Sequence, residues 1–227
     1  MQTALAISGS FLAPATALLR GTPSARPAAA PGLGATRAYT KDEEVFAEGD
    51  RAAYFYKVIS GAVRTSKLLT DGRRQIDAFH LPGDFFGIES GEEHRFSAEA
   101  LGEATVIAYR RCRLDTLAAS DAGFADQLVA AMMRSLERAQ DHMLLLGRKT
   151  AMEKIATFLL DLSGRVPQAG QVDLPMSRTD IADHLGLTIE TVSRSLTQLE
   201  RQGVIELPTH RRSIVLRDKA ALRRLEA

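Results

Sequence analysis

Three polar side chains lie close together in the stretch LTIETVSRSLTQLERQGVI, residues 187–205. Glu190, Ser193 and Arg194 are three and four positions apart, so on a helix they project from one face. They offer a carboxylate acceptor, a hydroxyl and a forked cation, which are groups that read base edges in the DNA major groove. The alternative is an ordinary solvated helix face, because polar outer stripes are common on surface helices. The neighbouring elements decide between these interpretations.

Capping signals predict two short helices around this stretch. Ser177 and Asp180 form a capping-box pattern at the start of the first helix. Gly186 is suited to end that helix, because glycine adopts the left-handed conformation at little cost. Thr188 can then cap the second helix. Two short helices joined by a tight turn are typical of a helix-turn-helix.

The second helix has an apolar stripe made of Val192, Leu196 and Leu199. If this stripe faces the domain core, the polar triad faces outward, as on a recognition helix in the major groove. Arg194 can then fork onto guanine, and Glu190 can accept from a cytosine amino group. Apolar runs at 204–207 and 213–216 predict the two strands of a wing.

Other polar and basic groups near this motif are expected to contact phosphates, which gives affinity without sequence information. These are Arg178, Thr188, Thr191, Thr197, His210, Arg211 and Arg212.

Short apolar or alternating runs broken by turn signals fill the chain from residue 39 to about residue 113. Asp71-Gly72, between two of these runs, is a strong hairpin signal. Many short antiparallel strands predict a small barrel or jelly roll. The expected strands are 54–59, 62–69, 75–81 and 105–109.

The pattern changes to a helical period at residue 121, and no Pro or Gly interrupts it between Gly123 and Gly147. Its apolar seam is narrow and close to a heptad, which favours pairing with a second copy of the chain. The alternative is a long core helix within one chain. A further helix at 150–162 and a loop at 163–175 are expected next. The residues expected to make the dimer are Phe124, Leu128, Met132, Leu136, Ala139, Met143 and Leu146.

The expected fold class is therefore α+β, with an antiparallel β-roll followed by a long dimerisation helix and a winged helix-turn-helix. The corresponding boundaries are 39–120, 121–147 and 148–227. Residues 1–38 are rich in Ala and Pro and contain no acidic residue, which predicts a disordered extension. An organellar transit peptide and upstream sequence from an early start codon are the alternatives.

Composition excludes several classes of protein. With 45% hydrophobic and 25% charged residues, the chain resembles an ordinary globular protein. The single cysteine, Cys112, excludes an internal disulfide and fits the reducing cytoplasm. No apolar run is long enough for a membrane helix. No phosphate-cradling loop and no nucleophile with an oriented base is present, so an enzyme is not expected.

The motifs resemble those of the Crp/Fnr family of bacterial transcription regulators over about residues 40–225. The stretches that carry the resemblance are YFYKVISGAVRTSK, HLPGDFFGIES and RTDIADHLGLTIETVSRSLTQLERQGVI. The last one is most similar to the FixK-like branch, whose ETVSR motif reads a palindrome of the form TTGA, a spacer, then TCAA. The resemblance implies that Glu190, Ser193 and Arg194 read bases. It also implies an activator that contacts RNA polymerase in low-oxygen or nitrogen-fixation control.

The resemblance leaves the signal open. Relatives that bind a cyclic nucleotide have Glu directly after the Gly of the GDFFG turn, whereas here Glu89 comes one place late and Arg95 is followed by Phe96. A one-residue slip turns a strand side chain to the other face, so no cofactor is expected. A cyclic nucleotide or haem in the β-roll is the alternative, and a ligand-binding or protein-interaction module without an operator is the alternative of another class.

Two smaller features also have two interpretations. Cys112 is flanked by Arg111 and Arg113, which would favour the thiolate of a redox switch, but a lone structural cysteine is the favoured interpretation. His80 and the Glu92-Glu93-His94 run are expected to be a strand histidine and a solvated loop rather than metal or haem ligands.

Overall fold

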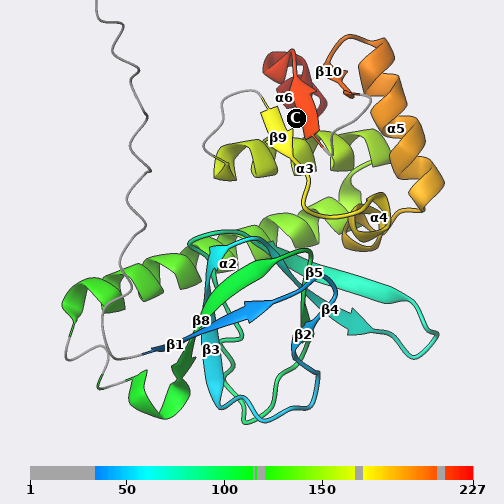
Figure 1. The fold of residues 1–227 in the computed structure, drawn as a ribbon. Coiled ribbons are helices and arrows are strands. Elements are labelled where there is room, and N and C mark those ends of the chain that lie inside the picture. The colour runs from blue at the N-terminus through cyan, green and yellow to red at the C-terminus, as the bar shows by residue number, and fades with distance from the viewer. Residues whose placement is uncertain (1–33, 115, 117–120, 167–170, 209–212, 227) are drawn as a thin grey trace, which may run out of the picture. The chain divides into compact units, whose positions relative to one another are not determined.

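The computed structural model describes residues 34–114, 116, 121–166, 171–208 and 213–226. Residues 32–227 form one compact unit. Figure 1 shows its β-rich N-terminal half, the long helix α2 and the mainly helical C-terminal half.

The N-terminal half is an antiparallel roll of two four-stranded sheets, in the orders β1-β8-β3-β6 and β2-β7-β4-β5. Aromatic and small side chains fill the space between the sheets, among them Phe46, Tyr56, Phe86 and Val106. This confirms the expected β-roll. The strands are β1 (Gly34–Tyr39), β2 (Glu44–Phe46), β3 (Tyr54–Ser60), β4 (Val63–Leu68), β5 (Arg74–His80), β6 (Phe85–Phe86), β7 (Ser97–Ala100) and β8 (Ala104–Arg110).

The hairpin expected at Asp71-Gly72 connects β4 and β5. Its loop closes where the Gly72 amide donates to the Leu69 carbonyl at 2.9 Å and the Leu69 amide donates to the Arg73 carbonyl at 2.7 Å. Gly72 has a φ of +84°, which a side chain would strain.

The expected boundary of the N-terminal extension at residue 38 is wrong, because residues 34–39 form β1. This strand pairs with β8 along its whole length, from Gly34 opposite Tyr109 to Tyr39 opposite Ala104. Its identity as a strand depends on that distant partner rather than on its own composition. Residues 1–33 lie outside the described part of the chain.

A long helix, α2 (Ala122–Arg148), follows the roll and the 3₁₀ turn η1 (Arg111–Arg113). The Asp121 side chain caps it by accepting from the Phe124 amide at 3.0 Å. Leu128 and Ala131 are buried against Phe55 and Ile107 of the roll, and Phe124 packs on the same cluster. One face of α2 therefore belongs to the core of its own chain.

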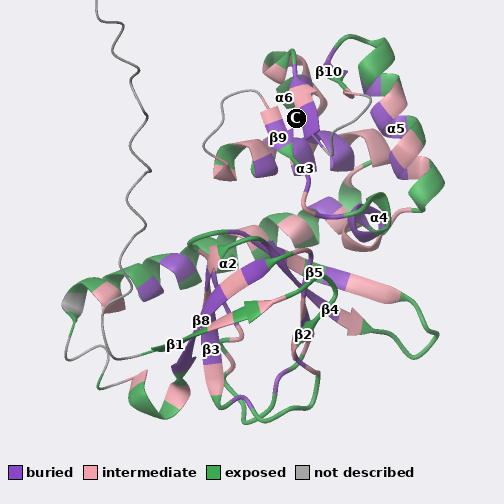
Figure 2. Cartoon of the chain, in the orientation of Figure 1, coloured by how far each residue is buried: buried purple, intermediate pink, exposed green. Residues whose placement is uncertain are grey.

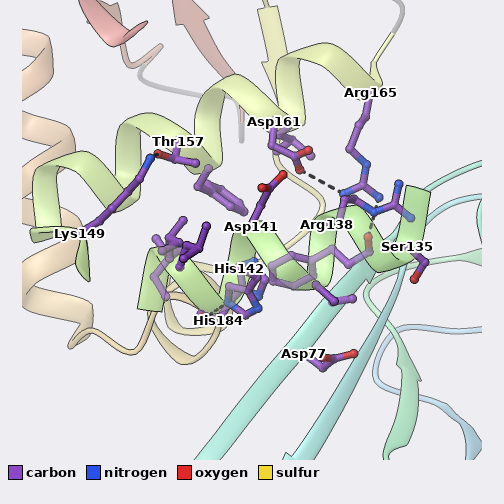
Figure 3. A pocket seen from close by; sticks show the side chains of 18 of the residues that line it. Asp77, Ser135, Arg138, Asp141, His142, Lys149, Thr157, Asp161, Arg165 and His184 are labelled. Atoms are coloured by element: carbon purple, nitrogen blue, oxygen red, sulfur yellow. Dashed lines mark hydrogen bonds and ion pairs between the residues drawn. The ribbon is translucent and has the colours of Figure 1, made fainter. Parts of the chain in front are cut away.

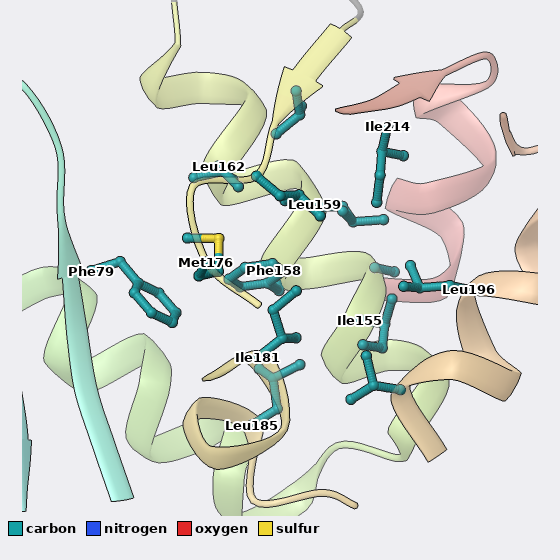
Figure 4. Packing of buried hydrophobic residues seen from close by; sticks show 14 of the residues in the cluster. Phe79, Ile155, Phe158, Leu159, Leu162, Met176, Ile181, Leu185, Leu196 and Ile214 are labelled. Carbon is teal, nitrogen blue, oxygen red and sulfur yellow. The ribbon is translucent and has the colours of Figure 1, made fainter. Parts of the chain in front are cut away.

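The C-terminal half packs four helices and a three-stranded sheet around one apolar cluster (Figure 4). The sheet has the order β10-β11-β9. The loop expected at 163–175 is wrong in part, since the preceding helix continues to Arg165 and residues 171–173 form a strand. The elements are α3 (Ala151–Arg165), β9 (Gln171–Asp173), α4 (Arg178–Leu185), α5 (Ile189–Arg201), β10 (Ile205–Glu206), β11 (Ser213–Leu216) and α6 (Lys219–Glu226).

Among the described residues, none of the helices is both long and apolar enough to cross a membrane.

Candidate nucleic-acid interface

Helix α4 begins with the capping box expected from the sequence. The Ser177 hydroxyl accepts from the Asp180 amide at 3.1 Å, and the Asp180 carboxylate accepts from the Ser177 amide at 2.9 Å. Gly186 ends the helix with φ 61° and ψ 43°. A residue with a side chain would be strained in this left-handed conformation, so glycine permits the sharp turn that leads into α5.

Helix α5 starts at the expected cap, where Thr188 Oγ1 accepts from the Thr191 amide at 3.2 Å. Val192, Leu196 and Leu199 are buried in the core that also contains Ile155 and Leu159 of α3. Figure 2 shows this division on α5, which carries exposed and buried faces. The apolar stripe therefore turns the opposite face of the helix outward.

The three expected base readers occupy that outward face, although to different degrees. Glu190 and Arg194 are exposed, whereas Ser193 is half-buried. The carboxyl group of Glu190 has a lowered pKa because its own backbone amide, the Thr188 hydroxyl and the charge of Arg194 stabilise the anion. An ionised Glu190 is an acceptor only, as pairing with a cytosine amino group requires.

The structure connects Arg178 directly with one of the base readers. Arg178 Nη1 donates to Ser193 Oγ at 3.3 Å. The sequence predicted only a phosphate contact for Arg178, because a contact between α4 and α5 has no local sequence signal. In this geometry Arg178 also orients the Ser193 side chain. Because the Ser193 oxygen is the acceptor in this bond, the hydroxyl hydrogen stays free to donate to another group.

The remaining backbone candidates are only partly described. Thr188 is exposed, Thr191 and Thr197 are half-buried, and the hydroxyls of Thr188 and Thr191 lie 3.1 Å apart. These three threonines belong to α5 or its cap, beside the base readers. His210, Arg211 and Arg212 lie outside the described residues, between β10 and β11, and their phosphate contacts stay predictions.

The expected dimer seam divides into two faces of α2. Phe124 and Leu128 pack on the roll of their own chain, and Leu146 packs on the C-terminal core. Met132, Leu136, Ala139 and Met143 are exposed. The exposed stripe of α2 also includes apolar residues that the sequence did not single out, namely Val129, Met133 and Leu144.

In the roll, Glu89 and Arg95 engage each other. The Glu89 carboxylate accepts from the Arg95 amide and from Arg95 Nε, both at 3.2 Å. His94 stacks on Phe46 with ring centroids 3.6 Å apart. His80 stacks on Phe86 at 5.0 Å. These histidines are core residues of the roll, each buried beneath an aromatic ring.

Cys112 is exposed in the η1 turn. The guanidinium of its neighbour Arg111 donates to the backbone carbonyls of Ser90 and Gly91. The charged group of Arg111 is therefore bound to a loop of the roll. A redox role for Cys112 stays a prediction.

Comparisons with known proteins agree with this architecture. A Crp-like helix-turn-helix domain model matches residues 153–225, and a cyclic nucleotide-binding domain model matches residues 36–121. The nitrogen fixation regulation protein FixK of Azorhizobium caulinodans is 51% identical over 210 residues, which cover 90% of this chain and 84% of that protein. The protein of the same name from Rhizobium meliloti is 44% identical over 194 residues, which cover 86% and 88%.

A solved structure is similar over nearly the same range. FixK2 from Bradyrhizobium japonicum superimposes with a TM-score of 0.79 at 52% sequence identity, and the match covers 86% of this chain and 98% of that one. The chain thus shares its helix-turn-helix and roll with proteins named as regulators.

Proposed function

The chain belongs to the Crp/Fnr family of transcription regulators, in its FixK-like branch, and we propose that it binds a palindromic operator as a homodimer. The observation that carries the proposal is the outward face of α5. This face carries Glu190, Ser193 and Arg194, and the opposite face of the helix is the buried apolar stripe. The capped helix α4 precedes it in the motif.

Base reading follows from the chemistry of this face. Arg194 is exposed and lies in the first half of α5, where a recognition helix meets the bases. Its fork matches guanine O6 and N7, while the ionised Glu190 matches cytosine N4. The half-sites TTGA and TCAA each contain one G·C pair, so one arginine and one glutamate per subunit suffice to read that pair.

The exposed stripe of α2 supports the homodimer. Val129, Met132, Met133, Leu136 and Met143 place apolar side chains on one side of the helix, with exposed fractions from 46% to 68%. A contiguous apolar surface of this kind is typical of an interaction site. Pairing with the same stripe of a second copy covers it and produces the two-fold symmetry that a palindrome requires.

We further propose that the regulator activates genes of low-oxygen respiration or nitrogen fixation and that RNA polymerase is its protein partner. The support is the similarity to FixK proteins, which are named as nitrogen fixation regulators. An activator has to recruit the polymerase to act.

The experiment is a binding titration by fluorescence anisotropy, combined with analytical ultracentrifugation. Two half-sites separated by about 6 bp have their centres about one helical turn apart. We expect a dimer that prefers this duplex over one with scrambled half-sites by on the order of 10³-fold or more. Equal affinity for the two duplexes, or a monomer bound to each half-site independently, would contradict the proposal.

A further inference from the structure

A buried carboxylate of the first motif helix connects the helix-turn-helix with the β-roll. Asp180 is only 4% exposed. One of its oxygens accepts from Arg64 Nη1 at 3.1 Å and from Arg74 Nη2 at 2.7 Å. The other accepts from the Ser177 amide at 2.9 Å and hydroxyl at 2.7 Å. The same group therefore caps α4 and binds two arginines of strands β4 and β5.

Arg64 is also held in place on the roll side. The Arg64 side chain is buried, and Glu99 accepts from its Nε at 2.8 Å while Asp42 lies 3.3 Å from its Nη2. Arg74 Nε donates to Asp183 at 2.9 Å, one turn along α4 from Asp180. Arg64, anchored on the roll, and Arg74 of β5 thus bind two carboxylates on one face of α4, which restrains the angle of this helix as well as its position.

Burial alone raises the pKa of Asp180. The hydrogen bonds from Ser177 and the charges of Arg64 and Arg74 outweigh burial and leave that pKa below its ordinary value. The carboxylate is consequently ionised at neutral pH, and each arginine contact to it is a charge-assisted hydrogen bond. Such bonds are about twice as strong as neutral ones.

Neutral hydrogen bonds fix the other end of α4. His184 Nδ1 contacts the Ile76 carbonyl at 3.1 Å, and the His184 carbonyl accepts from Gln75 Nε2 at 3.2 Å. His142 Nε2 of α2 lies 2.8 Å from the same carbonyl. Helix α4 is thereby attached to β5 at both of its ends.

Apolar packing beside this contact is incomplete. A cavity of about 420 Å³ lies between β5, α2, α3 and α4, and Phe79, His142, Phe158 and His184 are among its lining residues (Figure 3). Side chains along an open cavity lose contacts that would otherwise resist movement. Strand β5 and helix α4 nevertheless share one buried apolar cluster, so the polar contacts of Arg64 and Arg74 add a directional restraint on α4 to that packing.

We propose that Arg64 and Arg74 are positioning residues that set the half-site spacing the dimer accepts. They do not touch DNA in this proposal, but hold Asp180 and Asp183 so that each recognition helix is presented at a fixed angle. The inference rests on the proposed function. Each base pair added to a spacer moves a half-site by about 3.4 Å and rotates it by about 35°, which a rigidly held helix cannot follow.

The test compares operators with spacers of about 5, 6 and 7 bp for wild type, Arg74→Met and Arg64→Met in the full chain. Arg73→Met is the matched control, because Arg73 is adjacent in sequence and exposed and, within the described part of the chain, forms an ion pair only with Asp71 at the hairpin tip. We expect wild type and the control to prefer the best spacer by about tenfold or more, the equivalent of one lost base contact. For the Arg74 and Arg64 variants we expect that preference to fall to about threefold or less.

Several outcomes separate this inference from its alternatives. Unchanged spacer preference in variants that still bind the operator would overturn it. So would loss of all binding at an unchanged melting temperature, because the grip on α4 is proposed to set spacing rather than base contacts. If an arginine variant does not fold, Asp183→Ala removes one carboxylate partner of Arg74 and leaves the capping box, and the same drop in preference is expected. Absence of operator binding by the wild type would instead reject the proposed function.

Discussion

A substitution at Arg194 distinguishes base reading from general electrostatic attraction to DNA. It is exposed on the outward face of α5, and its fork is suited to two acceptors of one guanine. We expect Arg194→Ala to lose roughly 1 to 3 kcal/mol of operator-binding free energy. Binding to random duplex is expected to change little, because phosphate contacts elsewhere supply it. Parallel anisotropy titrations on both duplexes measure the difference.

The matched control for this variant is Arg201→Ala. Arg201 is an exposed arginine in the last turn of the same helix, far from the end that meets the bases. This substitution is expected to weaken binding to the operator and to random duplex by a similar small factor. An equal loss on operator and random DNA for Arg194→Ala would show that its role is electrostatic only.

His80 makes the stability of the roll depend on pH. Burial, opposed by the charge of Asp84 and assisted by Arg165 and Arg138, lowers the pKa of His80 to about 4. The unfolded chain takes up the proton at about pH 6.5. As pH falls from about 6.5 toward 4, the unfolded state binds more protons and the free energy of unfolding decreases. The slope from this group is up to about 1.4 kcal/mol for each pH unit.

Denaturant titrations at several pH values measure that slope. His80→Gln is expected to flatten it by up to the same amount, because glutamine does not titrate. Phe55→Leu is the control, since Phe55 packs on Phe85 and Tyr109 rather than on His80, and its loss destabilises the roll without removing a titrating group. If the two variants have the same slope as wild type, His80 does not cause this acid sensitivity.

The turn between α4 and α5 depends on the conformation of one residue. Gly186 has a φ of +61°, so we expect Gly186→Ala to lower the free energy of unfolding by about 1 to 2 kcal/mol. Gly147→Ala is the matched control, because Gly147 lies within α2 with open space around it. Alanine there is expected to stabilise the helix by roughly 0.5 to 1 kcal/mol. Opposite signs in chemical denaturation support the left-handed turn, and destabilisation by both would contradict this account.

The exposed stripe of α2 gives a prediction about assembly. Leu136 is 52% exposed in the middle of this stripe, and a charge there would have to be buried in the proposed dimer. We expect Leu136→Glu to shift the protein toward monomer in sedimentation experiments. Arg134→Glu, at an exposed position that is not three or four residues from any member of the stripe, is expected to leave the dimer unchanged. A dimer that survives Leu136→Glu would place the interface elsewhere.

Elements with local signals could be predicted from the sequence, and elements without them could not. Ser177, Gly186 and Thr188 cap or end their helices as expected, because each signal acts within three or four residues. The short strand β9 has no signal of its own and depends on pairing with β11. Helix α6 was not predicted, although its start has a local signal: Asp218 precedes it, and the Asp218 carboxylate caps it by accepting from the Ala221 amide at 2.8 Å.

At the scale of the whole molecule, the contacts that join the N-terminal and C-terminal halves are made by residues far apart in the sequence. Arg64 and Asp180 are 116 positions apart, and neither has a feature that identifies the other. The same holds for Arg178 and Ser193, whose contact joins two helices. A periodic pattern also could not tell which α2 residues pack on the roll and which stay exposed, because both sets are apolar and follow the helical period.

The most direct measurement is selection of operators by the full-length protein from a pool of random duplexes. We predict enrichment of one palindrome, with TTGA and TCAA half-sites whose centres lie about one helical turn apart. The same selection with Arg194→Ala should lose the preference at the G·C pair of each half-site and keep the spacing. Recovery of no shared sequence, or of a single half-site without a partner, would contradict the central claim that two outward α5 faces read DNA together.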